Sequence, residues 1–136
     1  MASELRVNTL KDASGNNSIA TSFVAGGSAK AWVNFNGTGT IAVRESFNTS
    51  GITDEGTGHY STSFTNAMSD ADYVVAGTAM FSANNNAHSV SYGDNNGANG
   101  EQPTASRYEV LTSYVYGSAV SSQDCTRVQQ IGRAHV

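Results

Sequence analysis

The chain contains one cysteine and one proline among its 136 residues. A single cysteine, Cys125, excludes an internal disulfide and a zinc site built from several cysteines. We expect Cys125 to be a small apolar strand residue, because no motif supplies the histidine and orienting group that a nucleophilic thiol needs. The lone proline, Pro103, excludes a proline-rich linker.

Charged residues are also scarce, at 13% of the chain, and the formal net charge is −4. Asn, Ser, Thr and Gly take their place, which favours extended β-structure with one solvated sheet face. The seven basic residues are scattered singly, so the sequence offers no basic patch for a nucleic acid. With 38% hydrophobic residues and six Tyr, the chain has enough apolar surface to form a core.

Long apolar runs are missing as well. The first residues, MASELRVNTL, lack the apolar segment of a secretory signal, and no run approaches the length that crosses a bilayer. We therefore expect a soluble chain that is made in a cytoplasm and does not insert into a membrane.

What the sequence does contain is a regular alternation of apolar and polar residues. In residues 31–36 every second side chain is apolar, and Trp32 lies on the opposite side from Val33 and Phe35. A Gly-Thr-Gly sequence at 37–39 then predicts a turn. This pattern is typical of a half-buried antiparallel strand pair.

The returning strand has a less regular pattern. Ile41, Val43 and Phe47 continue an apolar face on the alternating register, but Glu45 interrupts it. A charged residue at a core position predicts either an edge strand or a β-bulge.

Similar patterns predict the remaining elements. A nearly continuous apolar run at 73–80 predicts a strand in the centre of a sheet. Only residues 66–72 could form a helical turn, and helical periodicity is otherwise absent. The other predicted strands are 50–53, 60–64, 107–116 and 121–128, with a short one near residues 5–10. The sequence thus predicts an all-β fold, a small antiparallel β-sandwich with a short N-terminal extended leader.

Three segments are expected in order along the chain. Residues 1–28 form a leader with a turn at 12–17 and a Gly-Gly-Ser hinge at 26–28. Such a leader can bury little apolar surface alone, so it either packs on the following domain or associates with copies of itself. Residues 29–129 form the sandwich.

Residues 130–136 are expected to be a non-native tail. The end of the chain reads IGRAHV, which resembles the translated read-through of a common sequencing-library adapter, with Gln130 supplied by the preceding codon. We therefore expect the natural sequence to differ after Gln129, with its last strand missing or replaced. No function is assigned to Arg133 or His135.

The most exposed part of the domain is predicted to be the Asn-rich segment 84–101, as a loop or a loose hairpin around Val90 and Tyr92. Part of it resembles a calcium loop, but Ala98 and Ala105 occupy positions where an EF-hand needs oxygen ligands, which favours a solvated loop. The segment is instead our candidate receptor-contact loop, through Asn84, Asn85, Asn86, His88, Tyr92, Asp94, Asn95, Asn96 and Asn99.

Other chemistry-bearing residues favour structural interpretations. His59 and His88 have no second ligand at metal spacing and are expected on the surface. Asp54 and Glu55 are adjacent in a turn, whereas a glycosidase needs two carboxylates facing across a cleft. Trp32 and the tyrosines could form a sugar-stacking platform, although aromatic residues of β-domains lie more often in the core. No catalytic, cofactor-binding or metal-binding residue is predicted.

Residues 27–79 resemble a domain that recurs in tail-fibre and related virion proteins of bacteriophages, many of them marine. The resemblance is carried by KAWVNFNGTGT at 30–40, SGITDEGTG at 50–58 and FTNAMSDADY at 64–73. The chain departs from the family pattern at Glu55, where Asn is usual, and at residues 59–61. These changes do not disturb the apolar alternation.

The resemblance implies a non-enzymatic structural component of a virion, located at the tail fibre and assembled as a homotrimer. It implies other tail proteins and a host-surface glycan or protein as partners, without a cofactor. An alternative is a carbohydrate-binding module of a larger surface-glycan enzyme, which would bind a soluble sugar as a monomer. A small glycan hydrolase is disfavoured by the lack of a convincing acid pair.

Overall fold

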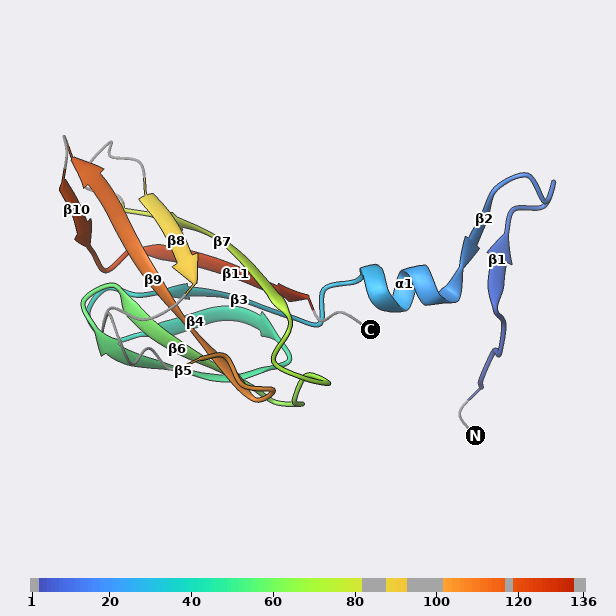
Figure 1. The fold of residues 1–136 in the computed structure, drawn as a ribbon, viewed down its shortest axis with the longest axis horizontal. Coiled ribbons are helices and arrows are strands. Elements are labelled where there is room, and N and C mark those ends of the chain that lie inside the picture. The colour runs from blue at the N-terminus through green and yellow to red at the C-terminus, as the bar shows by residue number, and fades with distance from the viewer. Residues whose placement is uncertain (1–2, 82–87, 93–101, 117–118, 134–136) are drawn as a thin grey trace.

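The computed structural model describes residues 3–81, 88–92, 102–116 and 119–133. Two antiparallel sheets pack against each other, and a separate N-terminal segment projects from one end of this sandwich (Figure 1). The predicted all-β sandwich with an N-terminal leader is therefore confirmed.

The first sheet has four strands in the order β4-β3-β11-β7. They are β4 (Ala42–Phe47), β3 (Ala31–Asn36), β11 (Arg127–Arg133) and β7 (Val74–Met80). Side chains of β3 alternate between buried and half-buried along the whole strand, as its sequence predicts. Apolar residues at every second position hold this face against the second sheet.

The second sheet is built around the long strand β9 (Arg107–Tyr116), whose bounds match the prediction. One edge of β9 pairs with β6 (His59–Phe64) and then with β10 (Ala119–Ser122), while β8 (His88–Tyr92) pairs with the other edge. β5 (Thr49–Gly56) lies beyond β6. Two strands thus meet end to end along one edge of β9.

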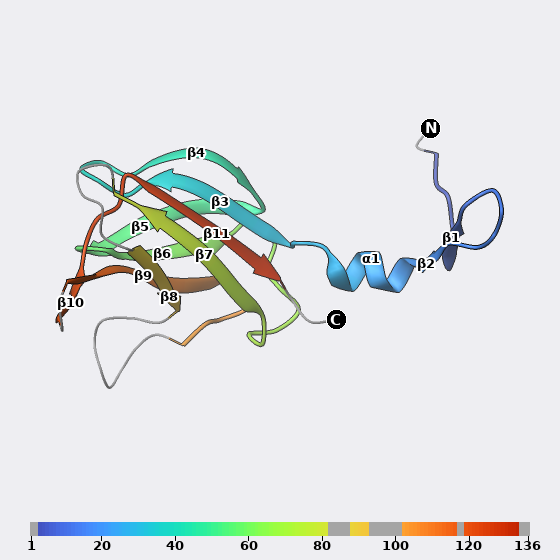
Figure 2. The same cartoon turned by 90° about the horizontal axis from the view of Figure 1, so that it is seen from above.

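The core lies between the two sheets, which Figure 2 shows from above. Aromatic rings fill much of it: Phe35 and Tyr60 meet edge to face with their centroids 5.1 Å apart, and Phe64 meets Tyr73 at 5.5 Å. Edge-to-face pairs add to the stabilisation from apolar burial. The buried apolar residues are Ala31, Val33, Phe35, Tyr60, Phe64, Met68, Tyr73, Tyr108, Val110, Cys125 and Val128.

The leader consists of a small hairpin and a short helix. β1 (Thr9–Lys11) pairs with β2 (Ser18–Ala20) across the predicted turn, where Gly15 has a φ of +73°. The sequence does not predict the helix α1 (Thr21–Gly27), which ends inside the expected hinge at 26–28. Its seven residues span about two turns and bury no side chain, so they carry no amphipathic pattern that a sequence could reveal.

Two strands differ from the prediction in their position. β7 lies at an edge of its sheet instead of the centre, and most of its side chains are exposed. β4 is an edge strand with a register shift opposite Asn34 and Phe35, so both of the predicted alternatives, an edge position and a bulge, are present. All side chains of β4 are exposed to solvent, so its predicted apolar face is not part of the core.

The last predicted strand, 121–128, is in fact two strands. β10 ends at Ser122, the chain turns through residues 123–126, and β11 then crosses to the other sheet. β11 pairs with both β3 and β7 and runs through Gln129 to Arg133 without a break. The non-native origin of residues 130–136 stays a prediction. Residues 66–72 form no helical turn.

Candidate functional site

Most of the predicted receptor-contact loop lies outside the described residues, so its role stays a prediction. Of its members, His88 and Tyr92 begin and end β8, which pairs regularly with β9. His88 is half-buried, with Nε2 3.0 Å from Oε1 of Gln123 and its ring near those of Phe81 and Tyr114. His88 is thus a packed strand residue instead of an exposed loop contact.

His59 is also not the surface residue that its sequence position predicts. Its Nε2 lies 2.8 Å from Oε2 of Glu109, and Arg107 Nη2 lies 3.2 Å from the other carboxylate oxygen. The side chains of His59 and Glu109 are only 16% and 7% exposed. Because Glu109 is held between two nitrogen partners, its burial is compensated. Register brings these residues together from neighbouring strands, which sequence spacing could not reveal.

The adjacent acidic residues Asp54 and Glu55 lie at the end of β5, beside the expected turn, and accept hydrogen bonds from their own hairpin. Asp54 Oδ1 accepts a hydrogen bond from Gly56 N at 3.0 Å, and Glu55 Oε1 accepts one from the Ser61 hydroxyl at 2.8 Å. Within the described ranges, no three His, Cys, Asp or Glu residues gather where they could hold a metal ion. No helix of the described chain is long and apolar enough to cross a bilayer.

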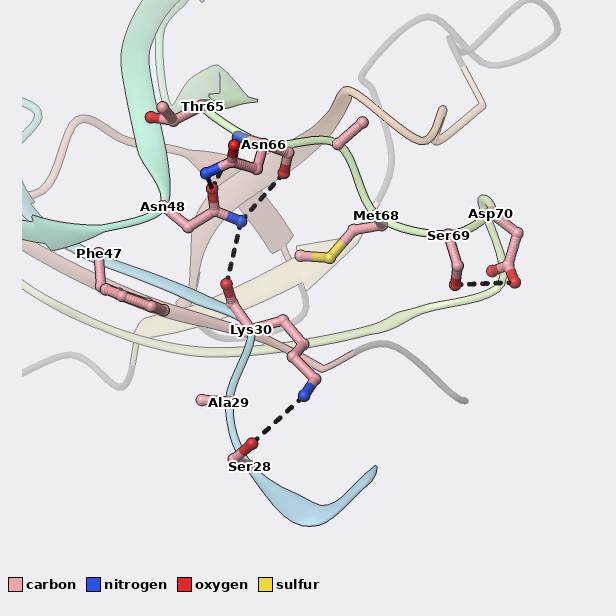
Figure 3. A pocket seen from close by; sticks show the side chains of 11 residues that line it. Ser28, Ala29, Lys30, Phe47, Asn48, Thr65, Asn66, Met68, Ser69 and Asp70 are labelled. Carbon is pink, nitrogen blue, oxygen red and sulfur yellow. Dashed lines mark hydrogen bonds between the residues drawn. The ribbon is translucent and has the colours of Figure 1, made fainter. Parts of the chain in front are cut away.

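An open hollow of about 790 Å³ lies where the leader joins the sandwich (Figure 3). Its walls come from residues 28–30, from the end of β4 and from residues 65–70. At its base, Asn48 Nδ2 donates to the carbonyl oxygens of Lys30 and Asn66, at 3.1 and 3.0 Å. Asn48 Oδ1 accepts from Asn66 N at 2.7 Å, and the backbone φ of Asn48 is +52°.

The two charged groups that line this hollow, those of Lys30 and Asp70, already have partners. The Lys30 ammonium donates to the Ala25 carbonyl and the Ser28 hydroxyl, and Asp70 accepts from Ser69 and from the backbone of Asp72. A ligand would have to replace these bonds. The hollow therefore resembles a hydrogen-bonded connection between leader and sandwich more than a ligand pocket, in which free polar groups converge.

Asp124 joins the two sheets, a role that no sequence pattern indicates. Its Oδ1 accepts from Gly58 N at 2.6 Å and from the Tyr60 hydroxyl at 3.0 Å. The same hydroxyl lies 3.1 Å from the carbonyl oxygen of Gly37, whose N–H donates to Cys125 O. One carboxylate thus ties the turn after β3, the start of β6 and the turn before β11.

This junction predicts a loss of stability at alkaline pH. Burial raises the pKa of the Cys125 thiol above 9.0, and burial followed by the nearby Asp124 carboxylate raises the pKa of Tyr60 above 10.0. The folded chain therefore holds both protons more tightly than the unfolded chain, so this stabilisation is complete below pH 9 and is lost as the pH rises further. We expect the free energy of unfolding to fall by about 2 kcal/mol between pH 8 and pH 10.5.

Urea unfolding at each pH measures this loss. The variant Cys125→Ala removes one of the two groups, so it should show a smaller alkaline loss than the parent chain, whatever its stability at pH 8. Equal unfolding free energies at pH 8 and pH 10.5 would contradict the prediction.

The outer face of the four-stranded sheet carries a band of apolar side chains. Trp32 points away from the buried residues of β3, and register places Phe47 and Ile131 beside it, with Ala76 beyond Ile131. Cross-strand partners share one face of a sheet. Phe47 is 55% exposed and Ile131 51%. We call these four residues the Trp32 row, which crosses four strands over roughly 14 Å.

A polar row runs beside it on the same face. It contains Glu45, Asn34, Gln129 and Thr78, one from each strand, and we call it the amide row. Arg44, the extra residue of the bulge, donates to Thr126 O at 2.6 Å and lies 3.4 Å from Asn34 Oδ1. Aromatic faces beside amide groups can hold a ligand with both apolar and hydroxyl surfaces. This outer face is the candidate site.

Comparisons with known proteins add no identification. No protein-family model, curated protein or solved structure matches the chain. The class of protein that the fold defines is a small β-sandwich with an N-terminal leader.

Proposed function

We propose that the chain is a module of a bacteriophage tail fibre, a non-enzymatic part of the virion that contributes to attachment at the host surface. In this proposal the module assembles as a homotrimer through its leader and joins other tail proteins. The proposal rests on the sequence resemblance of residues 27–79 and is supported by one structural observation, the composition and exposure of the leader.

The leader has no core of its own. Leu5 and Phe23 are 79% and 75% exposed, and its helix buries no residue. Figure 1 shows the hairpin and helix extending away from the sandwich. The other exposed large apolar residues of the leader are Val7, Leu10, Ile19 and Val24.

An isolated two-stranded hairpin and a seven-residue helix are marginal in water. Several copies of the leader, side by side, would cover these side chains and stabilise both elements. Identical copies that associate through the same element most often form closed symmetric assemblies. A thin assembled stem that carries one sandwich per chain is suited to a fibre.

Sedimentation equilibrium of the whole chain tests the proposal. We expect a mass three times that of the 14.2 kDa chain. The double variant Leu10→Ser, Phe23→Ser should sediment as a monomer with unchanged far-ultraviolet circular dichroism from the sandwich. The control Val120→Ser changes a side chain that is 70% exposed on β10, and it should keep the parent mass. A monomeric parent chain would contradict the fibre proposal.

The carbohydrate-binding module stays the second candidate, because the Trp32 row presents aromatic side chains outward. It differs from the fibre proposal in one measurable way. A module attached to an enzyme has no need to associate through its leader, so it would combine sugar binding with a monomeric mass.

A further inference from the structure

We propose that the outer face of the four-stranded sheet binds a neutral glycan chain. Trp32 and Phe47 would stack on sugar rings, and Asn34 and Gln129 would bond to their hydroxyl groups. The proposal deepens the proposed function and rests on it, because it names the class of host-surface molecule and moves the contact from the Asn-rich loop to the sheet.

The apolar part of the site comes from a pair of aromatic side chains. Phe47 lies directly opposite Trp32 on the neighbouring strand, so their Cβ atoms are about 5 Å apart. The C–H groups on one face of a sugar ring carry slight positive charge, which matches the negative face of an aromatic ring. Ile131 and Ala76 extend the apolar surface across the remaining two strands. Ile131 belongs to the segment of predicted non-native origin, so the stacking surface rests on Trp32 and Phe47.

The polar part of the site has unused hydrogen-bond donors. Asn34 Oδ1 faces the Arg44 guanidinium at 3.4 Å, and Gln129 Oε1 lies 3.4 Å from the Thr78 hydroxyl. In each amide the oxygen atom faces the neighbouring donor, so the NH₂ group lies on the side away from Arg44 or Thr78. Neither NH₂ group donates to another residue in the described part of the chain. Amides both donate and accept, as sugar hydroxyls do, and they carry no charge. The two charged residues beside them, Glu45 and Arg44, are of opposite sign, so this row favours a neutral ligand.

The geometry argues against a second copy of the chain as the occupant. A stable interface between proteins buries about 800 Å² on each partner around an apolar centre. Here the apolar surface that crosses all four strands is a single row, and the row beside it is polar. The other exposed apolar residues of β7 on this face, Val74 and Met80, lie on that edge strand alone. A flat protein partner would bury the amide groups of Asn34 and Gln129, which costs free energy unless each one finds a new bond. A narrow chain rich in hydroxyl groups supplies those bonds along its length.

Trp32 is the only tryptophan of the chain, so its fluorescence reports binding at this face directly. The probes are three soluble neutral glycans: cellohexaose, mannohexaose and laminarihexaose. We expect at least one of them to shift the emission to shorter wavelength in a saturable way, with a dissociation constant below about 1 mM. If none of the three changes the emission, the proposal is wrong.

Calorimetry of variants with the bound glycan then locates the site. Trp32→Ala and Phe47→Ala should each weaken binding about tenfold. Trp32→Phe keeps an aromatic face and should retain most of the affinity, which preserves the test if the alanine variant does not fold. The control Phe23→Ala removes an exposed aromatic ring from the leader and should leave the affinity unchanged.

Two further results would overturn the proposal. Glycan affinity that is unaffected in both alanine variants would place binding elsewhere. The second result has two parts: the Phe47→Ala variant loses the assembled mass of the parent chain, and the parent chain binds no glycan. Together they would show that a second copy covers this face. The fibre proposal is tested separately, by the sedimentation masses of the parent chain and of the leader variant.

Discussion

Gly58→Ala is expected to destabilise the sandwich by about 4 kcal/mol, a large share of the roughly 5–15 kcal/mol that stabilises a typical domain. Gly58 has a φ of +68°, a conformation that costs an alanine about 1 kcal/mol or more. A Cβ at this position would lie 2.5 Å from Thr112 O and 2.7 Å from Gln123 N. Both are backbone atoms, so neither can rotate away.

The contacts around Gly58 explain why the backbone cannot shift. Thr112 N donates to Gly58 O at 2.7 Å, and Gln123 N donates to Thr112 O at 3.0 Å. Gly58 thus lies where β6 begins and β10 has just ended, along one edge of β9. Relieving the clash would separate two strands from the longest strand of the sheet.

Gly39→Ala is the matched control. Gly39 has a similar φ of +63°, but no atom lies within 4 Å of the position its Cβ would take. Its cost should be the conformational part alone, about 1 kcal/mol. Urea unfolding of the two variants separates backbone strain from close packing. Equal losses in both variants would contradict the packing argument.

The fold could be predicted well where a strand has one buried and one solvated face. β3 has a strict alternation, and its buried and half-buried residues follow that order. The pattern of β9 predicts its correct bounds. By contrast, β7 is apolar along its length but lies at an edge. Its composition alone could not tell a central strand from an edge strand, because sheet order depends on contacts between distant segments.

In the candidate site, one extra residue in a strand makes the sequence pattern predict the wrong face for a side chain. The alternation correctly places Trp32 on the face opposite Val33, but it assigns Phe47 to the core. The bulge inserts Arg44 between Glu45 and Val43, whose partners are Asn34 and Phe35. A one-residue shift moves every following side chain to the other face. Glu45 and Phe47 therefore both point outward. The bulge thus explains both the charged residue at a predicted core position and the exposed aromatic ring of Phe47.

Asp124→Ala is expected to lower the free energy of unfolding by about 3 kcal/mol. The change removes the acceptor of two hydrogen bonds, from Gly58 N and from the Tyr60 hydroxyl. Both donors lie at the junction of the sheets, and Tyr60 is fully buried. The Gly58 N–H would be left without an acceptor, which costs more than the bond itself contributes, whereas the Tyr60 hydroxyl could still donate to Gly37 O at 3.1 Å. Bonds to a charged group are the stronger kind. Asp124→Asn keeps an oxygen there and should lose about 1 kcal/mol.

A double-mutant cycle with Tyr60→Phe isolates the bond between the two side chains. The phenylalanine ring has no hydroxyl to bond to the carboxylate, so the loss from Asp124→Ala should be about 1.5 kcal/mol smaller in that background. Asp54→Ala provides the control, because that exposed carboxylate accepts one bond from its own turn and its removal should cost at most about 0.5 kcal/mol. Strictly additive losses for Asp124 and Tyr60 would mean that the bond between these two side chains does not stabilise the junction. Coupling of the expected size would show that one half-buried aspartate connects the turn after β3, the start of β6 and the crossing to β11.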